Sequence, residues 1–373
     1  MREPNEIDFW RGFALATIFI NHIPGIYFER FTYRNLSLAD SAELFVFLAG
    51  WSLRLQVEGA AASLSSGQIF FRLCGRAVSV YIAQLVITEI ALALLAGASI
   101  LLDAPFLLDW HNAAAVFNDP VEAHVGLVLM LHQLGYFNIL PLYVVLMASA
   151  PFIALAFRYV PQALLPVSLA IYTSTLAFGI NLPTWPVEGS WFLNPLAWQL
   201  IFVGGFVLAG RRTFIGQLVR RHRRQLFWIA LPIVGLGIIV GLTRYSPEPL
   251  NVPDPKLFFV FDKTFLSPAR LLHMLALTAV FAGSFPLING IFPRSSAYLS
   301  LLGRNSLNVF CVGSLLSLAA QIFRFAYGGL IITDVGILVA GLAVMGMVAW
   351  VSEWRHRARV AASGLRVSPS ASA

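Results

Sequence analysis

Charged residues are scarce in this chain. Asp, Glu, Lys and Arg together make up 12% of its 373 residues, against about 25% in an ordinary soluble protein. Hydrophobic residues make up 58%, and a water-soluble globule could not bury that much apolar surface. The composition therefore excludes a soluble domain of the usual kind.

Cysteines are also few, and the common motifs of catalytic and metal sites are missing. Cys74 and Cys311 lie far apart, in or beside apolar stretches, so the sequence predicts neither a disulfide framework nor a thiolate metal site. No G-x-S-x-G, H-E-x-x-H or P-loop motif is present. We therefore expect no metal and no tightly bound cofactor. Any chemistry has to use a histidine as the general base, without a covalent intermediate on a serine.

The apolar residues cluster into stretches of about 20, the length that a helix needs to cross about 30 Å of hydrocarbon. This segmentation predicts an all-α, polytopic integral membrane protein with about ten transmembrane helices. The polar segment 102–126 is expected to be a loop or a helix on the membrane surface. The expected spans are residues 7–27, 41–58, 73–101, 127–149, 163–180, 194–210, 226–243, 269–288, 305–323 and 330–351.

Arginines between the apolar stretches account for the net charge of +7. They are not interleaved with base-stacking aromatic residues, so we expect no nucleic-acid binding. They concentrate in alternate loops, above all between Arg211 and Arg224, which predicts cytoplasmic N- and C-termini. That cluster could instead bind acidic membrane lipid or a cofactor phosphate.

The chain has no internal repeat, and residues 1–360 are expected to form a single transmembrane domain. The Ser- and Ala-rich segment 361–373 predicts a disordered cytoplasmic tail. Trp185, Trp191 and Trp198 are interpreted as an aromatic belt at the outer membrane interface, with a sugar-binding platform as the alternative.

Ionisable residues inside the first predicted span are the first candidates for a functional site. Such a residue costs about 2.5 to 3.5 kcal/mol on insertion scales, so it marks function by default. At 100° per residue Asp8, Arg11 and His22 project from one stripe, which runs about 16 Å from Arg11 to His22. The alternatives are an ion pair between Asp8 and Arg11 at the surface and a His22 held by a backbone carbonyl.

A second group of acidic residues stands at the start of the next predicted span. Asp40 and Glu43 are spaced i, i+3, and Asp40 could simply cap the helix. Glu43 lies directly before the apolar run and emerges on the same side of the membrane as His22. A carboxylate there could orient the imidazole and stabilise its charged form.

These two segments resemble the OpgC family of membrane proteins, which are required for succinylation of osmoregulated periplasmic glucans and are related to the acyltransferase-3 superfamily. The similar stretches are I-D-F-W-R-G-F-A-L-A-T-I-F-I-N-H-I-P-G from Ile7 and L-A-D-S-A-E-L-F-V-F-L-A-G-W from Leu38. Q-L-G-Y-F-N-I-L-P-L-Y, F-L-N-P-L-A-W-Q-L-I-F and L-G-R-N-S-L-N-V-F extend the resemblance over nearly the whole chain.

The resemblance implies a ten-helix enzyme of the bacterial inner membrane. It would take an acyl group, expected to be succinyl, from cytoplasmic acyl-CoA and place it on a sugar hydroxyl of a periplasmic glucan. His22 would be the general base, with Glu43 and Asp40 supporting its ring.

The resemblance also implies which residues bind the donor. Arg11, positioned by Asp8, would bind CoA phosphates together with Arg76 and Arg72. Acyltransferase-3 relatives carry an arginine pair spaced R-x-x-R, whereas Arg72 and Arg76 are one residue further apart.

Two other classes of function would fit a membrane protein with polar residues at depth. A transporter of a sugar or lipid-linked saccharide would also need a polar track, but it would not consume acyl-CoA. An accessory scaffold for a glucan synthase would not depend on His22. The sequence predicts no particular oligomeric state.

Overall fold

The computed structural model describes residues 3–59, 61–210 and 213–362. The described residues form helices and connecting segments, and their only β pairing is an isolated bridge between Pro183 and Ser190. The expected all-α class is therefore confirmed. The chain divides into two compact units, Met1–Tyr27 with Gly283–Ala373 and Phe28–Ala282, which are called unit 1 and unit 2.

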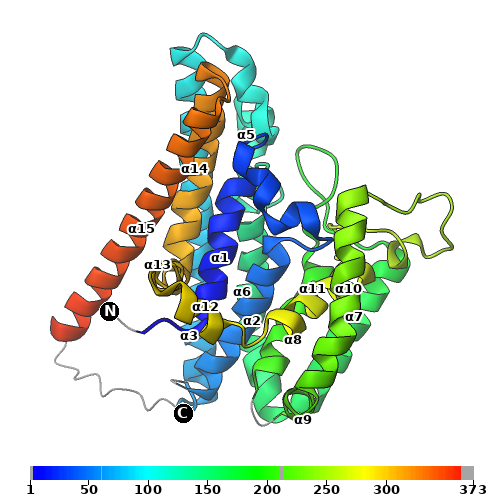
Figure 1. Cartoon of the computed structure of the whole chain (residues 1–373). Coiled ribbons are helices and arrows are strands. Elements are labelled where there is room, and N and C mark those ends of the chain that lie inside the picture. The colour runs from blue at the N-terminus through cyan, green and yellow to red at the C-terminus, as the bar shows by residue number, and fades with distance from the viewer. Residues whose placement is uncertain (1–2, 60, 211–212, 363–373) are drawn as a thin grey trace. The chain divides into compact units, whose positions relative to one another are not determined.

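Unit 1 combines the first helix of the chain with its last four. Helix α1 packs against α13 and α14, and α15 packs against α13 and α14 as well (Figure 1). Asn5 starts α1 because its side chain accepts the backbone N–H of Asp8, as N-cap residues do. The helices are α1 (Glu6–Asn21), α12 (Phe285–Ile291), α13 (Pro293–Arg304), α14 (Ser306–Tyr327) and α15 (Ile331–Ala362).

Two glycines allow α1 and α13 to touch through their backbones. A Cβ atom at Gly12 would lie 1.8 Å from the carbonyl oxygen of Leu299, and one at Gly303 would lie 1.9 Å from the carbonyl oxygen of Asp8. Small residues at such positions are typical of helix pairs in membranes. Packing therefore accounts for Gly12, the glycine that follows Arg11 in the stretch from Ile7.

Unit 2 contains the remaining helices. In it α2 packs on α8, α3 on α6, α7 on α8 and α10 on α11. Its helices longer than one turn are α2 (Ser41–Glu58), α3 (Ser66–Leu101), α4 (Ala114–Asn118), α5 (Pro120–Val128), α6 (Ile139–Tyr159), α7 (Leu164–Phe178), α8 (Pro195–Ala209), α9 (Phe214–Arg221), α10 (Arg223–Thr243) and α11 (Pro268–Phe281). The 3-10 segments are η1 (Tyr27–Phe31), η2 (Tyr33–Leu36), η3 (Pro105–Asn112), η4 (Pro161–Ala163) and η5 (Lys256–Phe258).

Helices α2 and α8 also pack through glycines. A Cβ atom at Gly50 would lie 1.9 Å from the carbonyl oxygen of Phe202, and one at Gly205 would lie 2.1 Å from the carbonyl oxygen of Phe47. Around Gly204, the preceding residue, no atom lies within 4 Å of the corresponding Cβ position. Of the two adjacent glycines of α8, Gly205 therefore has no room for a side chain, whereas Gly204 has.

We expect Gly205→Ala to destabilise the protein by about 1 to 3 kcal/mol, because the added methyl group has to push α2 and α8 apart. Gly204→Ala is the matched control, and it should be neutral or slightly stabilising because alanine is the better helix former. Thermal unfolding of both purified variants in detergent measures the difference. Equal unfolding temperatures would contradict the backbone contact.

Five of the described helices are long and apolar enough to cross a membrane, so this is a membrane protein. They are α3, α6, α10, α14 and α15, and the number becomes six if α11 and α12 are counted as one span. At 1.5 Å per residue the 36-residue α3 is about 54 Å long, which exceeds the hydrocarbon thickness. Helices also occupy the other expected positions, but α1, α2, α7 and α8 have only 15 to 18 residues. Ten spans and cytoplasmic termini stay predictions.

The expected span 127–149 is wrong in its first half. Helix α5 ends at Val128 and α6 begins at Ile139. Between them Met130 has a φ of 59° and Tyr136 a φ of 65°, values that a right-handed helix does not allow. The apolar composition of this segment hid the turn.

Two more segments differ from the expected pattern. Residues 293–304, expected as part of a cytoplasmic loop, form α13, and α15 continues to Ala362, beyond the expected end of the last span. Most of the predicted tail and the arginines Arg211 and Arg212 lie outside the described residues. The region 102–126 forms η3, α4 and most of α5, in agreement with a polar segment containing short helices.

Candidate functional site

His22 stands where α1 ends. It is the C-cap residue, and its backbone N–H donates to the carbonyl of Ile18. Its own carbonyl accepts a 2.6 Å hydrogen bond from the side-chain amide of Gln321 in α14. The residue as a whole is half-buried, so it is held in the protein while part of it stays accessible.

An arginine and an aspartate hold the turn that follows His22. Arg324 of α14 donates to the carbonyl of Pro24 at 2.7 Å and to that of Gly25 at 2.8 Å. Asp334 of α15 lies 2.9 Å from Arg324 Nε and accepts the backbone N–H of Tyr27 at 2.7 Å. Gly25 has a φ of 74°, which favours glycine. The position of His22 is thus fixed by contacts from α14 and α15.

The other two residues of the predicted stripe are engaged near the start of α1. Asp8 accepts a 2.6 Å hydrogen bond from the side-chain amide of Asn5. Arg11 donates to the hydroxyl of Ser306, the first residue of α14. The structure therefore places Asp8, Arg11 and His22 on one helix of unit 1, with Asp8 bound to the cap of its own helix.

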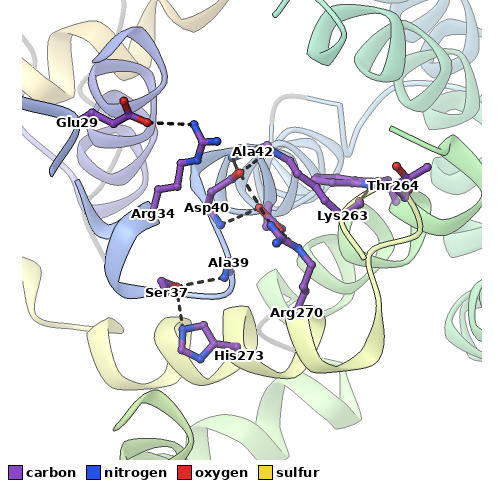
Figure 2. A network of polar contacts seen from close by, with 12 residues as sticks. Glu29, Arg34, Ser37, Ala39, Asp40, Ala42, Lys263, Thr264, Arg270 and His273 are labelled. Atoms are coloured by element: carbon purple, nitrogen blue, oxygen red, sulfur yellow. Dashed lines mark hydrogen bonds and ion pairs between the residues drawn. The ribbon is translucent and has the colours of Figure 1, made fainter. Parts of the chain in front are cut away.

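Asp40 and Glu43 form a capping box at the start of α2. The carboxylate of Asp40 accepts the backbone N–H of Ala42 at 2.9 Å, and that of Glu43 accepts the backbone N–H of Asp40 at 3.0 Å (Figure 2). This arrangement is the reciprocal N-terminal cap of helices. The capping alternative for Asp40 describes this geometry, and Glu43 belongs to the same cap.

Two basic side chains bind these acids from the region around the start of α11. Arg270 donates to Glu43 through both Nε, at 2.9 Å, and Nη2, and its Nη2 lies 3.9 Å from Asp40. Lys263 binds Asp40 at 2.5 Å. Figure 2 shows the side chains of Arg270 and Lys263 beside Asp40. Glu43 is 0% exposed, so its pair with Arg270 is the buried part of this ion-pair network.

The segment that carries Lys263 is anchored by α7 and α8. The indole N–H of Trp198 donates to the carbonyls of Lys263 and Thr264 at 3.1 and 3.2 Å. The hydroxyl of Tyr172 donates to the carbonyl of Leu266 at 2.8 Å. These bonds fix the chain just before Pro268 starts α11, and they place Lys263 beside α2.

The interpretation of the tryptophans as an aromatic belt is wrong for two of the three. Trp198 is 0% exposed and Trp191 is 3% exposed, whereas Trp185 is 41% exposed. A side chain enclosed by protein cannot face the lipid headgroups as an aromatic belt does. Trp198 instead supports the ion-pair network.

The charge on Asp40 is set by its cationic neighbours. Burial disfavours the carboxylate, but Lys263 and Arg270 outweigh burial, so the pKa of Asp40 lies well below its ordinary value. Such a group stabilises the fold fully above its unfolded pKa of about 3.9, and this contribution is lost only as the pH falls through the lower folded value. The carboxylate of Asp40 therefore stays ionised throughout the neutral range.

His273 lies near the network but has a packing role. Its Nε2 is 2.8 Å from the hydroxyl of Ser37, which also accepts the backbone N–H of Ala39 (Figure 2). A Cβ atom at Gly237 of α10 would lie 2.0 Å from the ring. The imidazole is thus pressed against α10 and 2% exposed, and it connects three segments of unit 2.

Arg72 and Arg76 lie near the N-terminal end of α3, away from the ion-pair network. Arg76 donates to the side chain of Gln56 near the end of α2, and Arg72 is exposed. From Asp40 to Gln56 the helix rises about 24 Å at 1.5 Å per residue. Within unit 2, Arg72 and Arg76 therefore lie near the opposite end of α2 from Asp40 and Glu43.

Arg54 is a buried charge that sequence reasoning missed. It is 1% exposed, pairs with Glu58 at 2.8 Å and stacks over the ring of Phe157, with 3.5 Å between its guanidinium carbon and the ring centroid. The guanidinium carbon also lies 5.1 Å from the centroid of the Phe206 ring. This cation–π arrangement accounts for the arginine as a part of the packing between α2, α6 and α8.

The predicted site residues are thus distributed over both units. His22, Asp8 and Arg11 belong to unit 1, whereas Asp40, Glu43, Arg72 and Arg76 belong to unit 2. Asp40 and Glu43 lie together, as expected from their spacing. The support of His22 by Glu43 connects the two units, and it stays a prediction.

Four further residues of these sites were missed, namely Lys263, Arg270, Arg324 and Asp334. Asp334 is 1% exposed and stands within a predicted apolar span, which was a usable signal. Lys256 and Lys263 are the only lysines of the chain, and both lie in a loop that the positive-inside rule places outside. Because basic residues are rare in outer loops, these lysines would have suggested that an acidic side chain pairs with one of them.

Apolar helices of spanning length, with ion pairs buried among them, define an integral membrane protein that holds charged groups in fixed positions. The family model described as OpgC protein matches residues 2–357, and the chain belongs to this family. No curated protein and no solved structure matches it. The family membership confirms the resemblance and indicates an acyltransferase-type function in glucan modification.

Proposed function

We propose that the protein is an O-acyltransferase of the bacterial inner membrane, with acyl-CoA as the donor and a periplasmic glucan as the acceptor. The observation that carries this proposal is the family match over residues 2–357. The matched range includes the two stretches that begin at Ile7 and Leu38. The acyl group is proposed to be succinyl. The donor is made in the cytoplasm and the glucan lies outside, so the acyl group has to pass through the membrane domain.

His22 is proposed as the general base. Its neutral imidazole takes the proton of the sugar hydroxyl while the oxygen attacks the thioester carbonyl carbon. The carbon–sulfur bond breaks, and the departing thiolate takes the proton back from the imidazolium. The products are the sugar ester and free CoA, and the histidine returns to its starting state.

The surroundings of His22 support this role. The hydrogen bond from Gln321 to its carbonyl and the Arg324–Asp334 pair at the next turn hold the end of α1 in place. A catalytic base has to be held by its neighbours in one orientation for efficient proton transfer. The half-buried position leaves room for a substrate hydroxyl to approach.

The deciding experiment uses the purified protein in lipid nanodiscs with a periplasmic-type glucan and either succinyl-CoA or acetyl-CoA. We expect acyl-glucan, detected by mass spectrometry, and an equal amount of free CoA, detected as thiol, with succinyl-CoA as the better donor. A folded sample that makes no product with either donor would reject the enzyme. Movement of glucan across the membrane without release of CoA would instead identify a transporter.

A further inference from the structure

Unit 1 contains a polar pocket of about 520 Å³ near the start of α1. Its walls come from the first turn of α1, the junction between α13 and α14, and the C-terminal part of α15. Arg304, Arg355, His356 and Arg359 are its basic lining residues, and Asp8 and Glu353 are the acidic ones. Among these residues the predicted motifs assign a role only to Asp8, that of positioning Arg11.

The acidic residues of the pocket already have partners. Glu353 lies 3.8 Å from Arg304 Nε, and Asp8 accepts the amide of Asn5. Arg355 and Arg359 are spaced i, i+4 on α15, so they share one face of the helix. Both are exposed. Two like charges at this spacing repel each other, and an anion bound between them would relieve that repulsion.

The remaining lining residues offer neutral polar groups. Asn305, Asn308 and Ser352 complete the wall, and the amide of Asn308 donates to the hydroxyl of Ser352 at 2.9 Å. Among the described residues that line the pocket, none is apolar. Guanidinium groups bind phosphate oxygens through paired hydrogen bonds, so this polar wall suits phosphate groups better than an apolar ligand.

We propose that this pocket binds the phosphate groups of an organic phosphate, namely the nucleotide end of the thioester donor, through Arg355 and Arg359. The assignment rests on the proposed function for the identity of the ligand. It differs from the sequence prediction, which gave the phosphates to Arg11, Arg72 and Arg76.

The position of the pocket on α1 fits a donor with a long arm. Asp8 lies in the pocket wall, and His22 lies about 21 Å further along the helix at 1.5 Å per residue. Both residues belong to the same stripe of α1. A donor with its phosphates in the pocket would need a flexible chain of this length to bring the thioester to the base, and acyl-CoA has its acyl group at the end of such an arm.

The test measures equilibrium binding of CoA, without an acyl group or an acceptor, to the full-length protein in nanodiscs of zwitterionic lipid. We expect Arg355→Gln with Arg359→Gln to weaken CoA binding at least tenfold. Arg357→Gln is the matched control, since Arg357 is exposed on the same helix and does not line the pocket. It should bind CoA as the unmodified protein does. Equal binding by the double variant would overturn the proposal.

Two further arms identify the source of the phosphate. Dephospho-CoA should bind more weakly than CoA, and the difference should disappear in the double variant, if the pocket holds the 3′-phosphate. A labelled anionic phospholipid tests the alternative source. Loss of lipid binding in the double variant with CoA binding intact would overturn the assignment to the donor.

The outcomes also separate this inference from the proposed function. A protein that binds CoA through Arg355 and Arg359 but transfers no acyl group would reject the enzyme and keep the pocket. A double variant that transfers succinyl groups with an unchanged KM for the donor would reject the pocket and keep the enzyme.

Discussion

Replacing His22 with alanine is expected to reduce acyl transfer by about 10²- to 10⁴-fold, the contribution of a general base. The variant removes the imidazole that accepts the hydroxyl proton, whereas the contacts around it use backbone groups. Gln321 bonds to the carbonyl of residue 22, and Arg324 bonds to the carbonyls of the next turn. The end of α1 should therefore keep its shape, and the loss should appear in kcat more than in KM.

The control for this prediction is His124→Ala. His124 is exposed on α5, and its ring contacts only the carbonyl of Pro120 in its own helix among the bonds that the structure records for it. Its replacement should leave succinyl transfer unchanged. Full turnover by His22→Ala, in a sample with an unchanged unfolding temperature, would reject His22 as the base while leaving the enzyme in place.

The long apolar helices were predictable because apolar length is a local property. Helix α10 coincides closely with the span expected at 226–243, and α7 with the one at 163–180. The motif around α1 was also readable, since Asp8, Arg11 and His22 share one stripe. The prediction failed where it used composition alone. The segment around Met130 is apolar but turns through positive φ values, which side-chain hydrophobicity does not encode.

Pairings across long sequence distances could not be predicted. Arg270 reaches Glu43 and Arg324 reaches Asp334 only after folding, and no spacing rule connects them. Helix α13 shows the same limit, because its arginines suggest a cytoplasmic loop, and its packing against α1 through Gly12 and Gly303 becomes visible only in the structure. A single sequence contains the residues of such a contact but no sign of their partners.

The role of Glu43 illustrates how a correct position can carry an incomplete interpretation. The sequence placed it past the cap and assigned it to His22. The structure shows it within the capping box and bound to Arg270. Both carboxylate oxygens already accept hydrogen bonds inside unit 2, so its first contribution is to hold α11 against α2.

We expect Arg270→Ala to destabilise the protein by about 3 to 5 kcal/mol, the cost of leaving a buried charge without its partner. Glu43 is 0% exposed and would lose the two hydrogen bonds that the guanidinium donates to its Oε1. Asp40 would keep Lys263, so the remaining network could not neutralise both acids. Thermal unfolding of the purified variant in nanodiscs measures this loss.

A surface pair supplies the matched control. Arg34 lies 3.8 Å from Glu29, with 47% of its side chain exposed, and pairs of this kind contribute about 0 to 1 kcal/mol. Arg34→Ala should therefore shift the unfolding temperature much less than Arg270→Ala. Similar shifts in the two variants would show that the Arg270–Glu43 pair contributes no more to stability than a surface ion pair.

The double variant Glu43→Gln with Arg270→Gln separates the cost of an unpaired charge from that of lost packing. It removes both charges and keeps side chains of similar length, so much of the stability lost in Arg270→Ala should return. Because Lys263 still binds Asp40, the start of α2 should keep its cap. If the stability returns while acyl transfer does not, the ion pair serves the reaction as well as the fold; if both return, its role is structural.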